Sequence, residues 1–417
     1  MRRVRLSKLE CALCVLIAIA VAAPVGVLGG APGAKQVSSE KEWTIMMYWN
    51  ADNSLEFTTE FALGIWEQAL TSNADVNIVA YVDLLSKDGA WIYEISGGAR
   101  STIATWPEVN SSDPAVMKDF IQLAMEKFPA KKNMLVIQDH GYGWRGISQD
   151  ESNGDTLMPI DGIARVLKEV REENGRGIDL VSCDACNMAT IEVVYELRDA
   201  APYYLASQST VPFDGFPYRM FISDLIEHPE MSARDLAIDI THEFVVYYSD
   251  KWAYEHIYRY SQEFATMSAW DLSRAAALGD AFGQFTEVLE PLIADNKKAI
   301  EGARGYALQG TWTNMAGYEW MPDLIAFVDG LMGIDAGLDA SIINLETAYN
   351  DAMIVEDHSK KFGDSVHGMN IWFPPSLSQY NMRGWAWARQ FIYDGVGLDI
   401  VATSSWFDCL MAYYEAK

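Results

Sequence analysis

The sequence predicts an α/β protein in which helices cover both faces of a mostly parallel sheet, followed by a largely helical C-terminal region. Two observations support this prediction. In the first half of the chain, short apolar runs rich in Val, Ile, Leu, Met and Tyr alternate with longer amphipathic segments, as in proteins built from strand–helix–strand units. After about residue 220, amphipathic segments follow one another with few strand-like runs between them.

The N-terminus has the composition of an export signal. Four basic residues precede an uncharged apolar run over residues 11–30, and small residues follow. This run is nearly long enough to span a bilayer, so a cleaved signal peptide and an uncleaved membrane anchor both stay open. We therefore expect residues 1–34 to direct export, residues 35–42 to form a linker, and the remaining chain to lie outside the cytoplasm, either secreted or anchored.

Residues 43–220 contain the expected sheet. Five short apolar runs predict buried strands, namely Thr44–Trp49, Val76–Val82, Met134–Gln138, Ile178–Val181 and Tyr203–Ala206. Amphipathic segments between them predict helices at about 54–70, 113–128, 160–173 and 188–199. The second of these helices opens with Asp113-Pro114, a typical N-cap followed by a first helical position. A further run, Trp91–Ile95, predicts an antiparallel or edge strand.

Residues 221–417 are expected to be mostly helical. The amphipathic runs lie near 232–250, 271–302 and 338–350. Met369–Phe373 is again strand-like and is closed by two prolines. We expect it to return to the main sheet.

Charge and cysteine content exclude several classes of protein. The net charge is −27, from 58 acidic and 31 basic residues, which argues against binding to nucleic acid or to an anionic lipid surface. An acidic surface suits a positively charged substrate, although solubility explains it equally well. Beyond the leader only Cys183, Cys186 and Cys409 remain. Three cysteines cannot form a disulfide framework and leave at least one free thiol.

Two predicted strand ends carry reactive side chains. His140-Gly141 follows the strand at Met134–Gln138, and Cys186 follows the strand at Ile178–Val181. Functional groups collect beyond the carboxyl ends of parallel strands, and an imidazole near a thiol can activate it as a nucleophile. Gly141 lets its backbone approach a substrate, so its N–H and that of Cys186 are expected to form the oxyanion hole.

Cys183 and Cys186 also form a Cys-x-x-Cys sequence. This spacing occurs in thiol–disulfide oxidoreductases, which gives an alternative function. Because Cys183 is expected at the end of a buried strand, we favour an inert, space-filling thiol at that position.

Several stretches resemble the clostripain family of cysteine peptidases, relatives of gingipain, legumain and the caspases. They are Trp43–Glu56 (WTIMMYWNADNSLE), Leu135–Trp144 (LVIQDHGYGW), Asp150–Leu157 (DESNGDTL), Ile178–Leu197 (IDLVSCDACNMATIEVVYEL), Leu205–Tyr218 (LASQSTVPFDGFPY) and Gly368–Pro374 (GMNIWFP). The resemblance implies a caspase-like α/β/α sandwich over residues 43–220, with His140 and Cys186 as the catalytic pair.

The same resemblance implies that Asp184 and Asp214 line a specificity pocket. A buried Arg or Lys side chain needs a carboxylate partner. The alternatives are an N-cap of the following helix for Asp184 and a turn residue before glycine for Asp214. Some family members need calcium, and the acidic segment containing Asp150 and Asp155 offers oxygen ligands without the EF-hand spacing.

These observations together predict an exported cysteine endopeptidase. We expect hydrolysis of protein or peptide substrates after Arg, and next after Lys, through a thioester on Cys186. The chemistry itself requires no cofactor. Besides the oxidoreductase, an inactive peptidase-like binding protein remains as an alternative.

Overall fold

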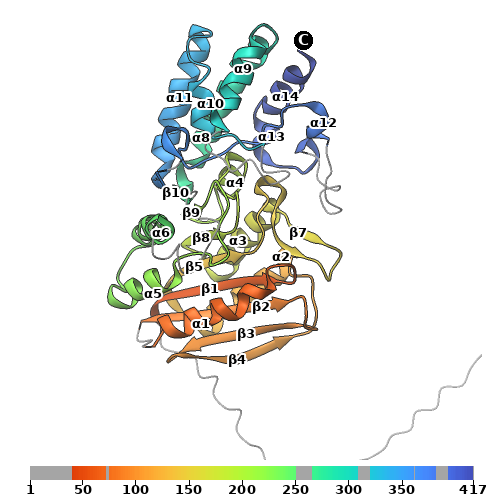
Figure 1. Ribbon diagram of the computed structural model, residues 1–417. Coiled ribbons are helices and arrows are strands. Elements are labelled where there is room, and N and C mark those ends of the chain that lie inside the picture. The colour runs from red at the N-terminus through yellow and green to blue at the C-terminus, as the bar shows by residue number, and fades with distance from the viewer. Residues whose placement is uncertain are drawn as a thin grey trace, which may run out of the picture. The chain divides into compact units, whose positions relative to one another are not determined.

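The computed structural model describes residues 40–71, 75–249, 265–308, 320–360, 362–381 and 393–416. Nine strands form one sheet in the order β11-β10-β9-β8-β5-β1-β2-β3-β4, and β6 and β7 form a separate pair (Figure 1). The strands are β1 Lys41–Ala51, β2 Val76–Leu84, β3 Ala90–Ser96, β4 Ala99–Trp106, β5 Ala130–Gln138, β6 Ile147–Asp150, β7 Thr156–Met158, β8 Leu180–Asp184, β9 Tyr203–Ala206, β10 Thr266–Asp271 and β11 Met353–His358.

The centre of the sheet is parallel and its two ends are antiparallel. Strands β2, β1, β5, β8 and β9 pair in parallel. Strands β3 and β4 continue one end in antiparallel pairing, and β10 and β11 continue the other. The buried, almost continuously apolar sequence of β1 is typical of a strand covered on both faces. The predicted α/β fold with a mostly parallel sheet is confirmed.

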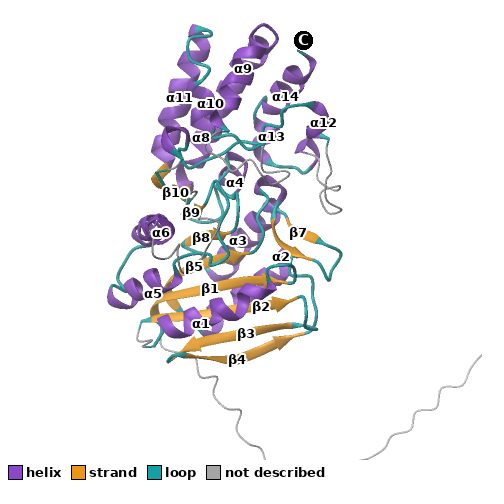
Figure 2. Cartoon of the chain, viewed as in Figure 1, coloured by secondary structure: helices purple, strands orange, loops and turns teal. Residues whose placement is uncertain are grey.

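Each face of the sheet packs against its own set of helices (Figure 2). Alternate residues of β1 enter different cores: Met46 and Tyr48 lie in one, and Ile45 and Met47 in the other. The helices are α1 Thr59–Ala69, α2 Pro114–Lys127, α3 Ile160–Asn174, α4 Ile191–Glu196, α5 Tyr218–Glu227, α6 Ala233–Ser249, α8 Ala275–Leu289, α9 Ile293–Ala307, α10 Leu324–Asp329, α11 Ala336–Ala352, α12 Leu377–Tyr380, α13 Asp399–Thr403 and α14 Trp406–Glu415. Side chains of α1, α5 and α6 fill the second core, and those of α2, α3 and α4 fill the first.

Most of the predicted helices lie close to their expected positions. The Asp113 side chain caps α2 by accepting a hydrogen bond from the Ala115 N–H, with Pro114 as the first helical residue. The expected helix at 271–302 is divided into α8 and α9 by a 3₁₀ turn at Glu290–Leu292. Helix α4 is shorter than expected because Thr190, rather than an earlier residue, caps it.

The C-terminal return to the sheet occurs at a different place from the one predicted. Met369–Phe373 is buried but forms only isolated bridges, through Asn370 to Thr190 and Asp323. The C-terminal region instead contributes β10 and β11 to the sheet, and these strands lie in and just after the stretch that was expected to be helical. Strand β4 also belongs to the sheet and was not predicted. Trp91–Ile95 lies in β3 and is antiparallel, as expected.

The leader at 1–34 and most of the expected linker at 35–42 lie outside the described residues. Strand β1 begins at Lys41, inside that linker. Among the described residues, no helix combines the length and apolar character needed to cross a membrane.

Candidate active site

The ends of β5 and β8 bring the two predicted catalytic residues to one edge of the sheet. Gln138, the last residue of β5, pairs with Asp184, the last residue of β8. His140 and Cys186 each follow two residues later. Because the strands run parallel and in register, the chain leaves both of them at the same level of the sheet.

The space around Gly141 shows how closely the two strand ends approach each other. A Cβ atom at position 141 would collide with the carbonyl oxygen of Cys186 and would lie 3.0 Å from its amide nitrogen. Only glycine leaves room for this backbone contact. The backbones of Gly141 and Cys186, the two expected oxyanion-hole residues, are therefore adjacent.

The His140 ring is held by the segment that follows β1. The Ser54 hydroxyl lies 2.9 Å from the His140 Nε2 atom. The neighbouring Asn53 side chain donates a 2.8 Å hydrogen bond to the Asp139 carboxylate, which also accepts from the His140 N–H. Burial lowers the pKa of His140 and raises that of Asp139 well above its usual range. A neutral imidazole in a fixed orientation is the form that can accept a proton from a thiol.

The Cys186 thiol contacts the loop that follows β9. The Val211 N–H donates to the Cys186 Sγ atom over 3.3 Å. The Cys186 residue is partly exposed, yet burial of the thiol raises its pKa to about 11, and the hydrogen bond from Val211 offsets only part of that effect. Among the described residues, no hydrogen bond joins the thiol to the His140 ring. The thiol is therefore protonated in the substrate-free protein at neutral pH.

Cys183 has the environment of a packing residue. It is 2% exposed within the core that α2, α3 and α4 cover, and the Tyr204 hydroxyl lies 3.4 Å from its sulfur. Burial raises the pKa of Cys183 to about 12. Cys183 and Cys186 are both free thiols. This environment opposes the thiolate that an oxidoreductase would need.

Asp184 is a buried carboxylate beside the predicted nucleophile. It is 2% exposed and accepts hydrogen bonds from the Phe216 N–H over 3.1 Å and from the Tyr218 hydroxyl over 2.5 Å. Its Oδ1 atom has no hydrogen-bond partner among the described residues. Burial raises the pKa of Asp184 to about 6. Since Thr190 caps α4, Asp184 is not the N-cap of the following helix.

Asp214 lies close enough to Asp184 for the two charges to repel. Burial raises the pKa of Asp214 to about 7, and Asp184 adds to the increase while a hydrogen bond from Tyr247 opposes it. The next residue, Gly215, has a φ of +69°, and its N–H bonds to Pro212, so Asp214 also belongs to a turn. The structure thus brings together the two carboxylates that the sequence singled out.

Two exposed aromatic rings contact each other, and one of them, Phe213, directly precedes Asp214 in the chain. Phe57 and Phe213 are 66% and 56% exposed, and their ring centroids lie 5.3 Å apart in an edge-to-face arrangement. Phe57 follows the segment that holds His140, and Phe213 precedes Asp214. The pair therefore joins the segment that contacts His140 to the loop that carries Asp214.

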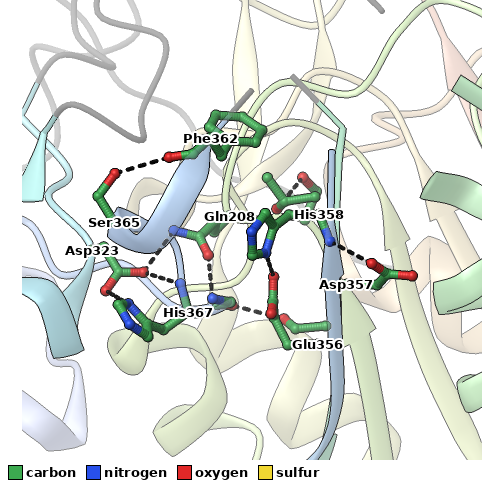
Figure 3. Close-up of polar contacts among 12 residues, drawn as sticks. Gln208, Asp323, Glu356, Asp357, His358, Phe362, Ser365 and His367 are labelled. Atoms are coloured by element: carbon green, nitrogen blue, oxygen red, sulfur yellow. Dashed lines mark hydrogen bonds and ion pairs between the residues drawn. The ribbon is translucent and has the colours of Figure 1, made fainter. Parts of the chain in front are cut away.

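A buried polar network fixes the chain just before Val211. Gln208 donates to the Asp323 carboxylate over 3.0 Å, and that carboxylate also accepts from the backbone and ring of His367 (Figure 3). Gln208 and Asn370 bond to each other as well. The network ties the end of β9 to the start of α10 and to the extended segment around Asn370.

The two acidic residues considered for calcium have different partners in the structure. The Asp155 carboxylate accepts a 2.6 Å hydrogen bond from the Gln149 side chain. Asp150 instead belongs to a group of carboxylates with Asp52, Asp83 and Glu108. Of these four carboxylates, only Asp150 was predicted from the sequence as a calcium ligand.

Residues from other segments that contact His140, Cys186 and Asp184 were not predicted from the sequence. Asn53 and Ser54 come shortly after a predicted strand. Because functional groups collect beyond the carboxyl ends of parallel strands, the argument that predicted His140 could also have predicted these two residues. Val211 and Tyr218 lie in the quoted stretch Leu205–Tyr218, but the sequence did not indicate their contacts, which depend on the path of the loop after β9.

Three comparisons place the chain among known proteins. The profile of the Clostripain family matches residues 47–378. Clostripain from Hathewaya histolytica is 27% identical over 214 residues, which are 42% of this chain and 40% of that protein. The match thus spans less than half of the length of this curated relative.

Solved structures share the fold. A secreted C11 cysteine protease from Bacteroides thetaiotaomicron, bound to an irreversible peptide inhibitor, has a TM-score of 0.66 and 19% identity, covering 88% of this chain and 99% of that chain. An inactive zymogen C11 protease from Parabacteroides distasonis has a TM-score of 0.60 and 18% identity, covering 81% of this chain and 93% of that chain. Since the family profile covers most of the sequence, the chain belongs to the clostripain family of cysteine peptidases, family C11.

Proposed function

We propose that this protein is an exported cysteine endopeptidase that cleaves after Arg, and next after Lys, with Cys186 as nucleophile and His140 as its catalytic partner. The observation that carries this proposal is the approach of the two strand ends, where only a glycine at 141 fits against the backbone of Cys186. Membership of a cysteine peptidase family supports the reaction class.

The resting charges suggest how the first step proceeds. Because burial raises the pKa of Cys186 and lowers that of His140, both groups are neutral before substrate binds. His140 then takes the thiol proton as the sulfur attacks the substrate carbonyl carbon. The carbonyl oxygen becomes an oxyanion, which the N–H groups of Gly141 and Cys186 stabilise.

The rest of the cycle reuses the same groups. His140 gives its proton to the departing amine, which leaves a thioester on Cys186. Water then attacks the thioester while His140 accepts the proton from that water; the C–S bond breaks, the acid product leaves, and His140 returns the proton to the Cys186 sulfur. The Ser54 hydroxyl keeps the imidazole in place through the cycle.

The acidic pair supports the preference for a basic side chain. Asp184 and Asp214 are desolvated, since burial is the main cause of both raised pKa values, and the charge of Asp184 adds to the increase at Asp214. A guanidinium placed between them relieves the repulsion and forms charge-assisted hydrogen bonds. Lys supplies a point charge instead of a planar fork and is expected to rank second. Exposed Phe57 and Phe213 offer apolar contact area for neighbouring residues of a peptide.

Three variants of the full-length chain test the catalytic assignment. With a fluorogenic peptide that carries Arg before the reporter, Cys186→Ala and His140→Ala are each expected to lose at least about a thousandfold in rate. Cys183→Ser is the matched control and is expected to keep most of the activity. An active Cys186→Ala together with an inactive Cys183→Ser would overturn the proposal.

A further inference from the structure

Residues 207–211, which follow β9, run beside the candidate nucleophile. The Val211 N–H donates to the Cys186 Sγ atom over 3.3 Å. The Asn187 N–H donates to the Ser209 carbonyl oxygen over 2.8 Å. These two hydrogen bonds connect the segment after β9 both to the thiol and to the backbone that directly follows it.

The backbone that follows the thiol is strained. Asn187 is 4% exposed and has a φ of +57°, in the left-handed region that residues other than glycine seldom occupy. Such a conformation costs free energy and persists only where the surrounding structure holds it. The hydrogen bond to Ser209 is one such restraint. The direction of the neighbouring Cys186 N–H, which is expected in the oxyanion hole, therefore depends on where the segment after β9 lies.

Gln208 attaches residues 207–211 to the C-terminal region. Its side chain is 0% exposed, and its Nε2 atom donates to the Asp323 carboxylate over 3.0 Å (Figure 3). The same atom donates to the Asn370 side-chain oxygen over 3.0 Å, and the Gln208 Oε1 atom accepts from the Gly368 N–H. Because both donors and the acceptor of this amide are used, the side chain is fixed in one orientation.

The turn that carries Asp214 has a separate attachment, to α6. The Tyr247 hydroxyl donates to the Asp214 carboxylate over 3.3 Å, and the Tyr248 hydroxyl donates to the Gly215 carbonyl oxygen over 2.6 Å. A Cβ atom at position 215 would collide with the Asp184 carboxylate, so the turn also packs directly against the other acidic residue. These contacts do not involve the buried polar network, and they hold the acidic pair independently of it.

We infer that Gln208 is a positioning residue for Cys186 and acts through the backbone of residues 207–211. It holds the Val211 N–H against the sulfur, where this donor stabilises the thiolate that forms during attack. It also maintains the strained turn at Asn187. Because Gln208 is completely buried, it acts without touching the substrate. Its effect on turnover rests on the proposed role of Cys186 as nucleophile.

The substitution Gln208→Met tests this role, because Met has a similar volume and cannot form the three side-chain hydrogen bonds. In the full-length chain we expect kcat for an Arg peptide to fall at least about 30-fold, since a small misplacement of reacting groups costs up to about a hundredfold. The preference for Arg over Ala peptides is expected to stay within about threefold of that of the unmodified chain, because α6 holds the acidic pair. An unchanged kcat, or a parallel loss of rate and preference, would overturn the inference.

The substitution Thr286→Val is the matched control. Thr286 on α8 is also 0% exposed, and its hydroxyl donates to the Gly283 carbonyl oxygen over 2.8 Å and accepts from the Ser405 N–H over 3.0 Å. Thr286→Val therefore removes buried hydrogen bonds outside the polar network, and kcat is expected to stay within about twofold. A loss of kcat equal to that of Gln208→Met would show general destabilisation and contradict the inference.

The substitution Gln208→Glu keeps the test valid if Gln208→Met fails to fold. The new carboxyl group has the shape of the amide but donates to Asp323 only while it is protonated. Relative to the unmodified chain, kcat is therefore expected to lie within about threefold at pH 5 and at least about 30-fold lower at pH 9. Asp323 faces this position directly, and His367 faces it through Asp323, under the influence of Asp329 and Glu356. A kcat ratio that stays constant over this range would contradict the inference.

Alkylation of the thiol separates the role of Gln208 from the proposed peptidase activity. At pH 8, iodoacetamide is expected to modify Cys186 at least about fivefold more slowly in Gln208→Met, because the thiolate loses the hydrogen bond from Val211. Slower alkylation in this variant, with no peptide hydrolysis by the unmodified chain, would leave Gln208 as a positioning residue of the thiol and remove the proposed function. Hydrolysis by the unmodified chain, with alkylation and kcat both unchanged in Gln208→Met, would remove the inference alone.

Discussion

Cys186 and His140 lie in surroundings that disfavour their charged forms. Burial raises the pKa of the thiol to about 11 and lowers the pKa of the imidazole. A thiolate–imidazolium pair therefore does not stand ready in the free protein. In the proposed mechanism, proton transfer from Cys186 is therefore coupled to substrate attack, and the N–H groups of Gly141 and Cys186 stabilise the charge that develops.

At the residue scale, the substitution Asp214→Asn tests the source of specificity. A neutral substrate side chain beside Asp184 and Asp214 leaves a desolvated carboxylate unpaired, which costs roughly 2–5 kcal/mol, or about 30-fold to several thousandfold in turnover. Asp214→Asn is therefore expected to lower kcat/KM for Arg peptides much more than any residual cleavage after Ala. Peptides with Arg, Lys, Asn, Asp and Ala before the reporter measure this ratio.

Asp214 is the better position for this experiment because Asp184 also organises the protein. Asp184 accepts from Phe216 and Tyr218, so Asp184→Asn would disturb both the loop and the charge. Preferential cleavage after Asp or Asn by the unmodified protein would contradict the acidic pair as the specificity element.

The sequence predicted those catalytic and acidic residues that lie at strand ends or in quoted motifs. The candidate catalytic residues His140 and Cys186 follow from where apolar runs stop, because parallel strands deliver their ends to one edge, whereas Asp184 was singled out by the family resemblance. Contacts made across loops carry no such signal: Val211 reaches Cys186 only after the chain turns back from β9. The carboxylates around Asp52 stayed hidden for the same reason, since four segments supply them.

At the scale of elements, the Gln208–Asp323–His367 network controls where the loop after β9 lies. Burial by itself lowers the pKa of His367, but the hydrogen bond and charge of Asp323, helped by Asp329 and Glu356, raise it overall. Since the folded pKa exceeds the ordinary 6.5, protonated His367 contributes stability that is fully present below that value. This contribution is lost as pH rises through the raised pKa.

The substitution His367→Gln tests this contribution. The Tm of the unmodified chain is expected to exceed that of His367→Gln most at about pH 6 and least at about pH 9. His228→Gln, at an exposed histidine with a 63% accessible side chain, is the control. A Tm difference that stays constant or grows with pH would contradict protonation of His367 in the folded protein.

Strands and helices could be predicted from the sequence wherever a single local pattern was enough to identify them. The central strands are continuous apolar runs, and helices such as α2 carry a cap and an apolar stripe. Met369–Phe373 misled because a buried apolar run looks like a strand whether or not a neighbour pairs with it. Strand β10 was missed because it is only six residues long, and its pairing with β9 and β11 is a tertiary property.

At the scale of the whole molecule, the basic and then apolar leader predicts export. Mature protein is expected outside the cytoplasm, and N-terminal sequencing distinguishes the two routes. A start between Ala23 and Lys35 indicates a cleaved signal and secretion, whereas an intact leader in the membrane fraction indicates an anchor. A protein found entirely in the cytoplasm would contradict export.

The central claim is that Cys186 attacks peptides held by a basic side chain. Mapping by mass spectrometry where an irreversible peptidyl ketone attaches to the full-length chain tests it most directly. We predict a single label on Cys186, formed at least about 30-fold faster with Arg than with Ala next to the ketone, and no label in Cys186→Ala. Attachment at Cys183 or Cys409 instead, or equal labelling rates for the Arg and Ala reagents, would contradict the account.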